Sequence, residues 1–171
     1  MAEQPKALVG VVMGSDSDLE VMQRCVKQLE AFGIACEARV ISAHRTPVAA
    51  HEYAQTAAGR GLKVIIAGAG MSAALAGVLA ANTTLPVIGV PIDAGQLNGL
   101  DALLSTMQMP PGVPVACMSV GAAGATNAAI LAVQILATAD PALADRLAQF
   151  KQDQARKVAE KDARLRGSSD G

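Results

Sequence analysis

Short apolar runs that alternate with helical patterns constrain this sequence more than any other feature. The runs are typical of parallel strands buried on both faces, and they cover residues 7–13, 36–41, 63–67, 85–90 and 115–120. Apolar residues recur at helical spacing in residues 18–32, 47–58, 72–81, 100–107 and 126–137, and from Pro141 onward. This order predicts a three-layer α/β/α sandwich with a central parallel sheet and right-handed crossovers, of the flavodoxin-like or Rossmann-like kind.

The size and composition of the chain favour one domain that associates with copies of itself. Within 171 residues we predict a single domain over residues 1–165 and a disordered tail over residues 166–171. Hydrophobic residues make up 51% of the chain and aromatic residues only 2%, so the core is built from small aliphatic side chains. This apolar excess suggests that other subunits cover part of the surface. We therefore expect a homo-oligomer in which the last helix packs on neighbouring subunits.

Charge, apolar runs and cysteine usage exclude several classes of partner. The net charge is −1 and no basic patch rich in aromatics occurs, which argues against nucleic acid. Two uncharged runs, residues 64–81 and 112–139, are long enough for a membrane span, but internal glycines and prolines divide them into strand, turn and helix. Three isolated cysteines and the lack of a signal peptide favour buried thiols in a reducing cytoplasm.

Residues 42–47, Ser-Ala-His-Arg-Thr-Pro, are the first candidate for chemistry. They follow a predicted strand, and Thr46 and Pro47 fit the N-cap and first position of the next helix. His44 and Arg45 would then lie in a loop at the carboxyl end of the sheet, where open α/β folds bind ligands. An imidazole beside a fixed cation suits acid–base catalysis, although a noncatalytic His44 fits the same pattern equally well.

A second candidate is the loop Gly14–Asp18, between the first predicted strand and helix. Backbone N–H groups there, starting at Gly14, can bind an anion, and the hydroxyls of Ser15 and Ser17 can add donors to a phosphate. Asp18 would repel that phosphate, so a sugar hydroxyl is its better partner. The same residues are equally suited to cap the helix, since Ser17 and Glu20 have the spacing of a capping box.

Residues 68–73, Gly-Ala-Gly-Met-Ser-Ala, match the dinucleotide-binding pattern G-x-G-x-x-G/A. They follow a predicted strand, and Asp93 comes about twenty residues later after the next one. However, two strand–helix units precede the pattern, and too little chain follows for a second nucleotide half and a substrate domain. We therefore favour a glycine turn that brings the backbone close to a smaller ligand.

No metal site or covalent nucleophile is evident in the sequence. The two histidines, His44 and His51, are seven residues apart, and no carboxylate or thiol cluster completes a set of ligands. His51 falls inside a predicted helix, where a structural role is the default. The patterns of a nucleophile elbow and a P-loop are also missing.

Taken together, several segments in order resemble the class I PurE family, the bacterial carboxyaminoimidazole ribonucleotide mutases of the AIR carboxylase group. The resemblance rests on Met-Gly-Ser-Asp-Ser-Asp, Ser-Ala-His-Arg-Thr-Pro and Ala-Gly-Ala-Gly, and it continues through Leu-Pro-Val-Ile-Gly-Val-Pro, Gly-Leu-Asp, Gln-Met-Pro, Asn-Ala-Ala and Gln-Ile-Leu, at residues 13–18, 42–47, 67–70, 85–91, 99–101, 108–110, 127–129 and 134–136. It covers nearly the whole chain and includes three separate site loops.

The resemblance implies a three-layer fold assembled as an octamer, with active sites at subunit contacts. It also implies a reaction in de novo purine biosynthesis without metal, nucleotide cofactor or biotin. In that reaction the carboxylate on the exocyclic nitrogen of a small ribonucleotide moves to ring carbon C4. The substrate loses CO2 to give aminoimidazole ribonucleotide (AIR), and C4 then attacks the trapped CO2.

By the same resemblance, His44 matches the family's catalytic histidine, which supplies a proton to the departing nitrogen and later takes one from C4. Ser15 and Arg45 match positions that bind the substrate phosphate. Asp18 matches a position that contacts the ribose.

The other expected substrate-binding residues lie in the same three loops. Ser42, Ala43 and Gly70 match backbone near the base and the migrating carboxylate. Gly14 and Ser17 belong to the expected phosphate loop.

The sequence departs from the family after Gly70. Where the family commonly reads Gly-Gly-Ala-Ala-His-Leu or Gly-Met-Ala-Ala-His-Leu, this chain has Gly-Met-Ser-Ala-Ala-Leu, so Ala74 stands at the usual histidine. Three alternatives to the mutase stay open: direct carboxylation of AIR by CO2, which is the class II activity; a dinucleotide-binding module; and a relative with modified or lost activity.

Overall fold

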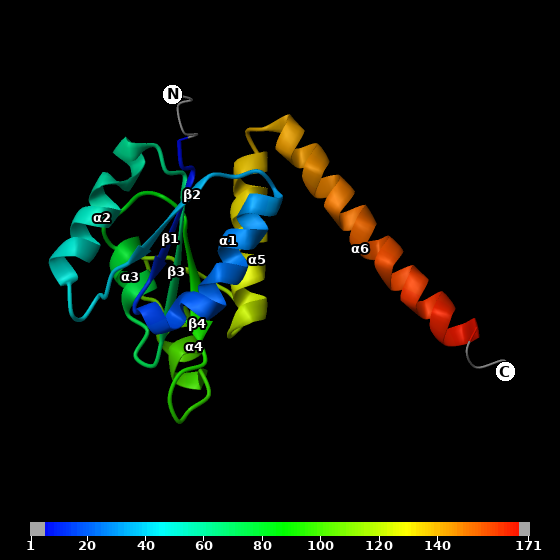
Figure 1. The fold of residues 1–171 in the computed structure, drawn as a ribbon. Helices are drawn as coiled ribbons and strands as arrows, with labels where there is room; N and C mark the ends of the chain where they lie inside the picture. Colours follow the sequence, from blue (N-terminus) through cyan, green and yellow to red (C-terminus); the bar gives the residue numbers. More distant parts are fainter. Residues whose placement is uncertain (1–5, 168–171) are drawn as a thin grey trace. The chain divides into compact units, whose positions relative to one another are not determined.

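The computed structural model describes residues 6–167, and its centre is a five-stranded parallel sheet in the order β2-β1-β3-β4-β5 (Figure 1). The strands are β1 (Val9–Met13), β2 (Cys36–Val40), β3 (Val64–Gly70), β4 (Val87–Ile92) and β5 (Ala116–Cys117). Every residue of β1 and β4 is buried, as expected for parallel strands covered on both faces. The predicted α/β fold with a parallel sheet is confirmed.

Within residues 6–167, the chain also forms a short 3-10 turn and six helices. They are η1 (Asp16–Asp18), α1 (Leu19–Ala31), α2 (Pro47–Arg60), α3 (Leu75–Ala80), α4 (Leu100–Met107), α5 (Ala122–Ala137) and α6 (Pro141–Gly167). Helices α2 and α3 pack on one face of the sheet through small side chains such as Ala54, Ala57 and Ala76. Figure 1 places α1 on the other face. There, Gly68 of β3 leaves room for Met22 of α1.

Several predicted elements have other bounds in the structure. The helix expected over residues 126–137 is one of them, since α5 begins four residues earlier, at Ala122. The expected strand 115–120 is wrong in length, because β5 contains only Ala116 and Cys117. After it, the N–H groups of Met118 and Gly121 still donate to the carbonyls of Gly89 and Pro91.

The expected helix 72–81 begins late, at Leu75, while β3 continues to Gly70 opposite Ile92. In the intervening turn, Met71 has a left-handed φ of 55°, which interrupts a helix.

The chain divides into two compact units, one ending at Val133 and one running from Gln134 to the C-terminus. The second unit contains the end of α5 and α6, and the Asp140 carboxylate caps α6 by accepting the N–H of Leu143 at 3.1 Å. The single domain over residues 1–165 stays a prediction. Helix α6 includes residues 166 and 167 of the predicted tail, and residues 168–171 lie outside the described part. Within residues 6–167, no helix is long and apolar enough to cross a membrane.

Candidate active site

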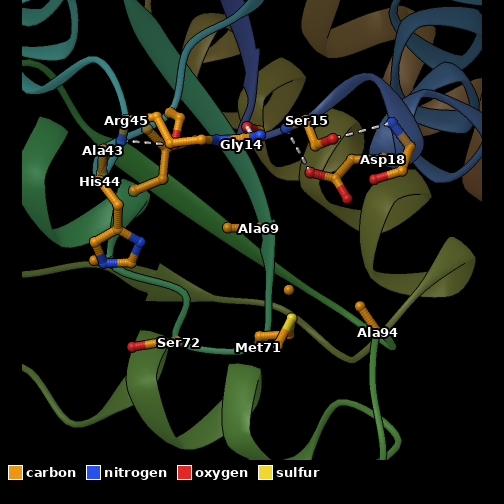
Figure 2. Close-up of a pocket in the computed structure, with 15 residues that line it drawn as sticks. Gly14, Ser15, Asp18, Ala43, His44, Arg45, Ala69, Met71, Ser72 and Ala94 are labelled. Carbon is orange, nitrogen blue, oxygen red and sulfur yellow. Dashed lines mark hydrogen bonds between the residues drawn. The ribbon is translucent and has the colours of Figure 1, made fainter.

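A cavity of about 470 Å³ opens beyond the carboxyl ends of β1, β2 and β3 (Figure 2). Because β2 lies on one side of β1 and β3 on the other, this is a topological switch point, where open parallel sheets bind ligands. The cavity brings together all of the predicted site residues: Gly14, Ser15, Ser17, Asp18, Ser42, Ala43, His44, Arg45 and Gly70. Their roles in substrate binding and catalysis stay predictions.

The turn after β1 is closed by reciprocal hydrogen bonds between Ser15 and the residues that follow. The N–H of Ser15 donates to Asp18 Oδ2 at 3.0 Å, and Ser15 Oγ accepts from the N–H of Ser17 at 3.4 Å. This pair is a capping box that starts η1 and leads into α1. The predicted capping box of Ser17 and Glu20 is therefore wrong, since Ser17 already lies inside the helical turn.

Asp18 lies at the inner side of this turn, with only 7% of its surface exposed. Burial raises the pKa of its carboxyl group, and the N–H groups of Ser15 and Gly14, the Ser17 side chain and the charge of Arg45 act in the opposite direction. The carboxyl group is thus a fixed hydrogen-bond acceptor in the wall of the cavity.

The Asp16 carboxylate accepts hydrogen bonds from donors of the Gly14–Asp18 loop that we predicted to bind a phosphate. Its Oδ1 atom accepts from Ser15 Oγ at 3.0 Å and from the N–H of Ser17 at 3.1 Å. The Asp16 side chain is exposed and does not line the cavity. An anion that uses these donors must therefore displace the Asp16 carboxylate.

The loop between β2 and α2 is shaped by hydrogen bonds between its two ends. Thr46 is the N-cap residue of α2, as predicted, and Pro47 is the first helical residue. The Thr46 hydroxyl does not cap the helix; it donates to the carbonyl of Ser42 at 2.9 Å and accepts from the N–H of Ser42 at 3.0 Å. His44 and Arg45 project from the tight loop that these bonds close.

Arg45 links this loop to the turn after β1. Its Nη2 atom donates to the carbonyl oxygen of Gly14 at 3.0 Å, and its Nε atom donates to Ser42 Oγ at 3.4 Å. Arg45 is exposed. The guanidinium group is therefore held beside the Gly14–Ser17 turn, with donors left over for an anion.

Gly68 and Gly70 form neither a dinucleotide-binding turn nor the glycine turn that we expected in its place, so both expectations are wrong. Gly68 and Gly70 both lie within β3, so the chain makes no tight turn between them. A Cβ at Gly68 would overlap Met22, and a Cβ at Gly70 would lie 2.7 Å from that of Ala94. Gly68 therefore serves helix packing, whereas Gly70 allows close packing of the segment after β4 and also lines the cavity.

Several residues that were not predicted from the sequence also line the cavity: Ala69, Met71, Ser72, Leu75 and Ala94. Ala94 follows the carboxyl end of β4, so the rule that located the other loops could have found it. Ala74, which stands at the family's usual histidine, also lines the cavity.

The remaining titratable residues of interest lie outside the cavity lining. His51 Nδ1 is 2.7 Å from Asn82 Oδ1, a contact that joins α2 to the segment after α3. Cys25 is buried, and this burial is the main cause that raises the pKa of its thiol to about 12. The neighbouring Cys36 raises it further. Cys36 and Cys117 are half-buried rather than fully buried as expected. Among the described residues, no group of three or more His, Cys, Asp or Glu side chains could hold a metal ion.

Comparisons with known proteins agree with this arrangement. The family model described as AIR carboxylase matches residues 8–157. The N5-carboxyaminoimidazole ribonucleotide mutase of Pyrococcus abyssi is 57% identical over 148 residues, which are 86% of this chain and 84% of that protein. The mutase of the same name from Mycobacterium tuberculosis strain H37Rv is 56% identical over 163 residues, covering 95% of this chain and 91% of that protein.

A solved structure supports the same assignment. The crystal structure of Treponema denticola PurE superposes with a TM-score of 0.84 at 29% sequence identity, and the match covers 93% of this chain and 98% of that one. The family match spans the segments that build the cavity wall, from β1 through the residues after β4. This chain belongs to the AIR carboxylase family.

Proposed function

We propose that this protein is an N5-carboxyaminoimidazole ribonucleotide mutase, an isomerase of de novo purine biosynthesis. It converts N5-carboxyaminoimidazole ribonucleotide (N5-CAIR) to 4-carboxy-5-aminoimidazole ribonucleotide (CAIR). The observation that carries the proposal is a single cavity in which one imidazole, His44, lies with the residues expected to bind a ribonucleotide. Relatives that are more than 50% identical and bear the name of this mutase support it.

The phosphate of the substrate binds at the end of the cavity formed by the Gly14–Ser17 turn and Arg45. The hydroxyls of Ser15 and Ser17 and the Arg45 guanidinium supply donors there, and binding displaces the Asp16 carboxylate from its present partners. This exchange is favourable because a phosphate dianion gains the Arg45 cation, which Asp16 does not contact.

The ribose and base occupy the centre of the cavity. Asp18, a fixed acceptor beside the phosphate end, accepts a hydrogen bond from a ribose hydroxyl. Backbone groups of Ser42, Ala43 and Gly70 line the space that remains for the flat imidazole and its carboxylate. A side chain at position 70 is excluded because it would collide with Ala94.

The chemistry needs one proton carrier. The bond between the exocyclic nitrogen and the carboxylate carbon breaks, its electron pair stays on nitrogen, and protonated His44 gives that nitrogen a proton, leaving AIR and CO2. Carbon C4 then attacks CO2, forming a new carbon–carbon bond and an exocyclic iminium group. Neutral His44 removes the proton from C4, which restores the aromatic ring and the protonated histidine.

Two physical effects account for the acceleration. A positioned acid–base group contributes about 10²- to 10⁴-fold to such a reaction. Confinement of CO2 beside C4 adds a proximity effect, since CO2 that escaped would be diluted into solvent.

The class II alternative, direct carboxylation of AIR, is separated from the mutase by the choice of substrate. One assay mixture contains N5-CAIR, and the other contains AIR with bicarbonate. We expect efficient formation of CAIR only from N5-CAIR, and efficient turnover only of AIR with bicarbonate would overturn the proposal. The control is His44→Asn, which we expect to lower kcat by about 10²- to 10⁴-fold, because it removes the proton carrier.

We further propose that the protein acts in the cytoplasm as a homo-octamer. An apolar stripe supports self-association: Leu97, Leu100, Leu104 and Met107 follow each other at helical spacing along and just before α4, and about half of each side chain's surface is exposed. A second copy of the chain is its expected partner.

A further inference from the structure

Most polar side chains in the cavity wall already have hydrogen-bond partners in the protein. Ser15 donates to Asp16, Asp18 accepts from Ser15, and Ser42 accepts from Arg45. The Ser17 side chain also hydrogen-bonds Asp18. Within residues 6–167, the cavity-lining polar side chains without such a bond are those of His44 and Ser72.

The backbone fixes Ser72 at the cavity wall. Met71, just before it, has a left-handed φ of 55°, a conformation that a residue with a side chain seldom adopts without a structural or functional reason. The carbonyl of Ser72 accepts the N–H of Ala74 at 2.8 Å, which closes the turn before α3. Figure 2 shows Ser72 on the His44 side of the cavity, whereas Ser15 and Asp18 lie on the opposite side.

We propose that the Ser72 hydroxyl donates a hydrogen bond to the migrating carboxylate and holds the CO2 formed from it beside His44. This inference rests on the proposed mutase function and extends it to a residue that contacts the reacting group. The substrate carries two anionic groups, and Arg45 and the Gly14–Ser17 turn account for the phosphate. Ser72, at the other side of the cavity, is a donor for the second anion.

A neutral donor suits this group better than a cation would. The migrating group is a carboxylate in substrate and product but neutral CO2 in between. A cation would stabilise the carboxylate much more than CO2 and so raise the barrier to decarboxylation. A neutral hydroxyl can orient the group, and it stabilises the carboxylate relative to CO2 less than a cation does.

The surroundings of Ser72 favour retention of CO2. The neighbouring parts of the wall are apolar and come from Ala69, Met71, Ala74 and Leu75. Carbon dioxide has no net charge and no dipole, so an apolar wall with one hydroxyl donor suits it better than a charged wall would. Ser72 itself is exposed, so its hydroxyl can be reached by a ligand in the cavity.

Equilibrium binding of two ligands tests the contact directly. CAIR carries the carboxylate and AIR lacks it, while both carry the same phosphate and ribose. We expect Ser72→Ala to weaken CAIR binding roughly tenfold, as for loss of one hydrogen bond to a charged group, and to leave AIR binding unchanged. Ser72→Thr, which keeps a hydroxyl, should retain most of the preference for CAIR. Equal effects of Ser72→Ala on both ligands, or no effect on either, would overturn the proposal.

Turnover gives an independent readout. With N5-CAIR labelled at the carboxylate, Ser72→Ala should release several-fold more free AIR and labelled CO2 per CAIR formed than the wild type. The KM for N5-CAIR should rise as well, because the substrate carboxylate loses the same hydrogen bond. An unchanged ratio of released AIR to CAIR formed would contradict the role assigned to Ser72. Ser105→Ala, which removes an exposed hydroxyl on α4, is the matched control. A wild type that binds CAIR through Ser72 but does not turn over N5-CAIR would refute the mutase and leave the binding site standing.

Discussion

At the scale of single residues, the site contains a carboxylate that is costly to ionise. Asp18 is nearly buried, and burial raises its pKa above the ordinary value of 3.8. A carboxyl group whose folded-state pKa is raised contributes stability that is complete below its unfolded pKa and is lost as pH rises through the folded pKa. At pH values above this raised pKa, the wild type therefore bears the cost of ionising the buried group.

We expect Asp18→Asn to raise the free energy of unfolding at pH values above the pKa of Asp18, because the amide removes the charge that burial makes unfavourable. The difference from the wild type should shrink as the pH falls through the raised pKa of Asp18, because the carboxyl group then takes up its proton. Urea denaturation at a series of pH values measures this. A difference that grows at low pH would contradict the assigned burial cost. The same variant should bind the ribonucleotide less tightly, since an amide is a weaker acceptor for the ribose.

The sequence identifies most of the site at this scale, because three loops with suitable residues follow three strands of one parallel sheet. Ser15, His44 and Arg45 could be placed by this rule. It did not place Ser72, since the left-handed backbone of Met71 that precedes it has no signature in a residue that is not glycine. Nor could it show that Asp16 occupies the phosphate donors, because that depends on side-chain rotation.

At the scale of elements, glycines set how closely the chain segments approach. A Cβ at Gly124 of α5 would overlap the carbonyl oxygen of Ser119, which is backbone and cannot move aside easily. Gly59 of α2 has no neighbour within 4 Å of the same position. These two helical glycines form a matched pair for substitution.

We expect Gly124→Ala to destabilise the protein by about 3 kcal/mol through overpacking. In contrast, Gly59→Ala should stabilise it by roughly 0.5–1 kcal/mol, because alanine loses less backbone entropy in a helix. Urea denaturation at constant protein concentration measures both. Equal urea midpoints for Gly124→Ala and the wild type would contradict the close contact between position 124 and the carbonyl of Ser119.

Hydrophobic periodicity predicts the elements better than their ends. The helix at 100–107 has the bounds predicted for it, and α2 begins at Pro47 as its N-cap signal indicates. The strand at Ala116–Cys117 is shorter than its apolar run, because that run includes residues that already turn toward α5. Strand ends depend on pairing with a neighbour, which a single sequence does not reveal.

At the scale of the whole molecule, the apolar stripe on α4 predicts assembly. In light scattering, the wild type should have eight times the chain mass of 17.3 kDa. The double substitution Leu100→Asp and Leu104→Asp should lower that mass, because it places two charges in the contact. Ser105→Asp, one residue from the stripe, is the control and should leave the mass unchanged. A wild-type monomer, or a double variant of unchanged mass, would contradict the proposed assembly.

In the proposed mechanism, His44 moves a proton while a carboxylate migrates without leaving the cavity. The most direct measurement follows the carboxylate carbon: N5-CAIR labelled with ¹³C at the carboxylate is converted in excess unlabelled bicarbonate, and CAIR is analysed by mass spectrometry. We expect that CAIR made by the wild type keeps most of the label and that His44→Asn forms almost no CAIR. Unlabelled CAIR from the wild type, or a fully active His44→Asn variant, would contradict this mechanism.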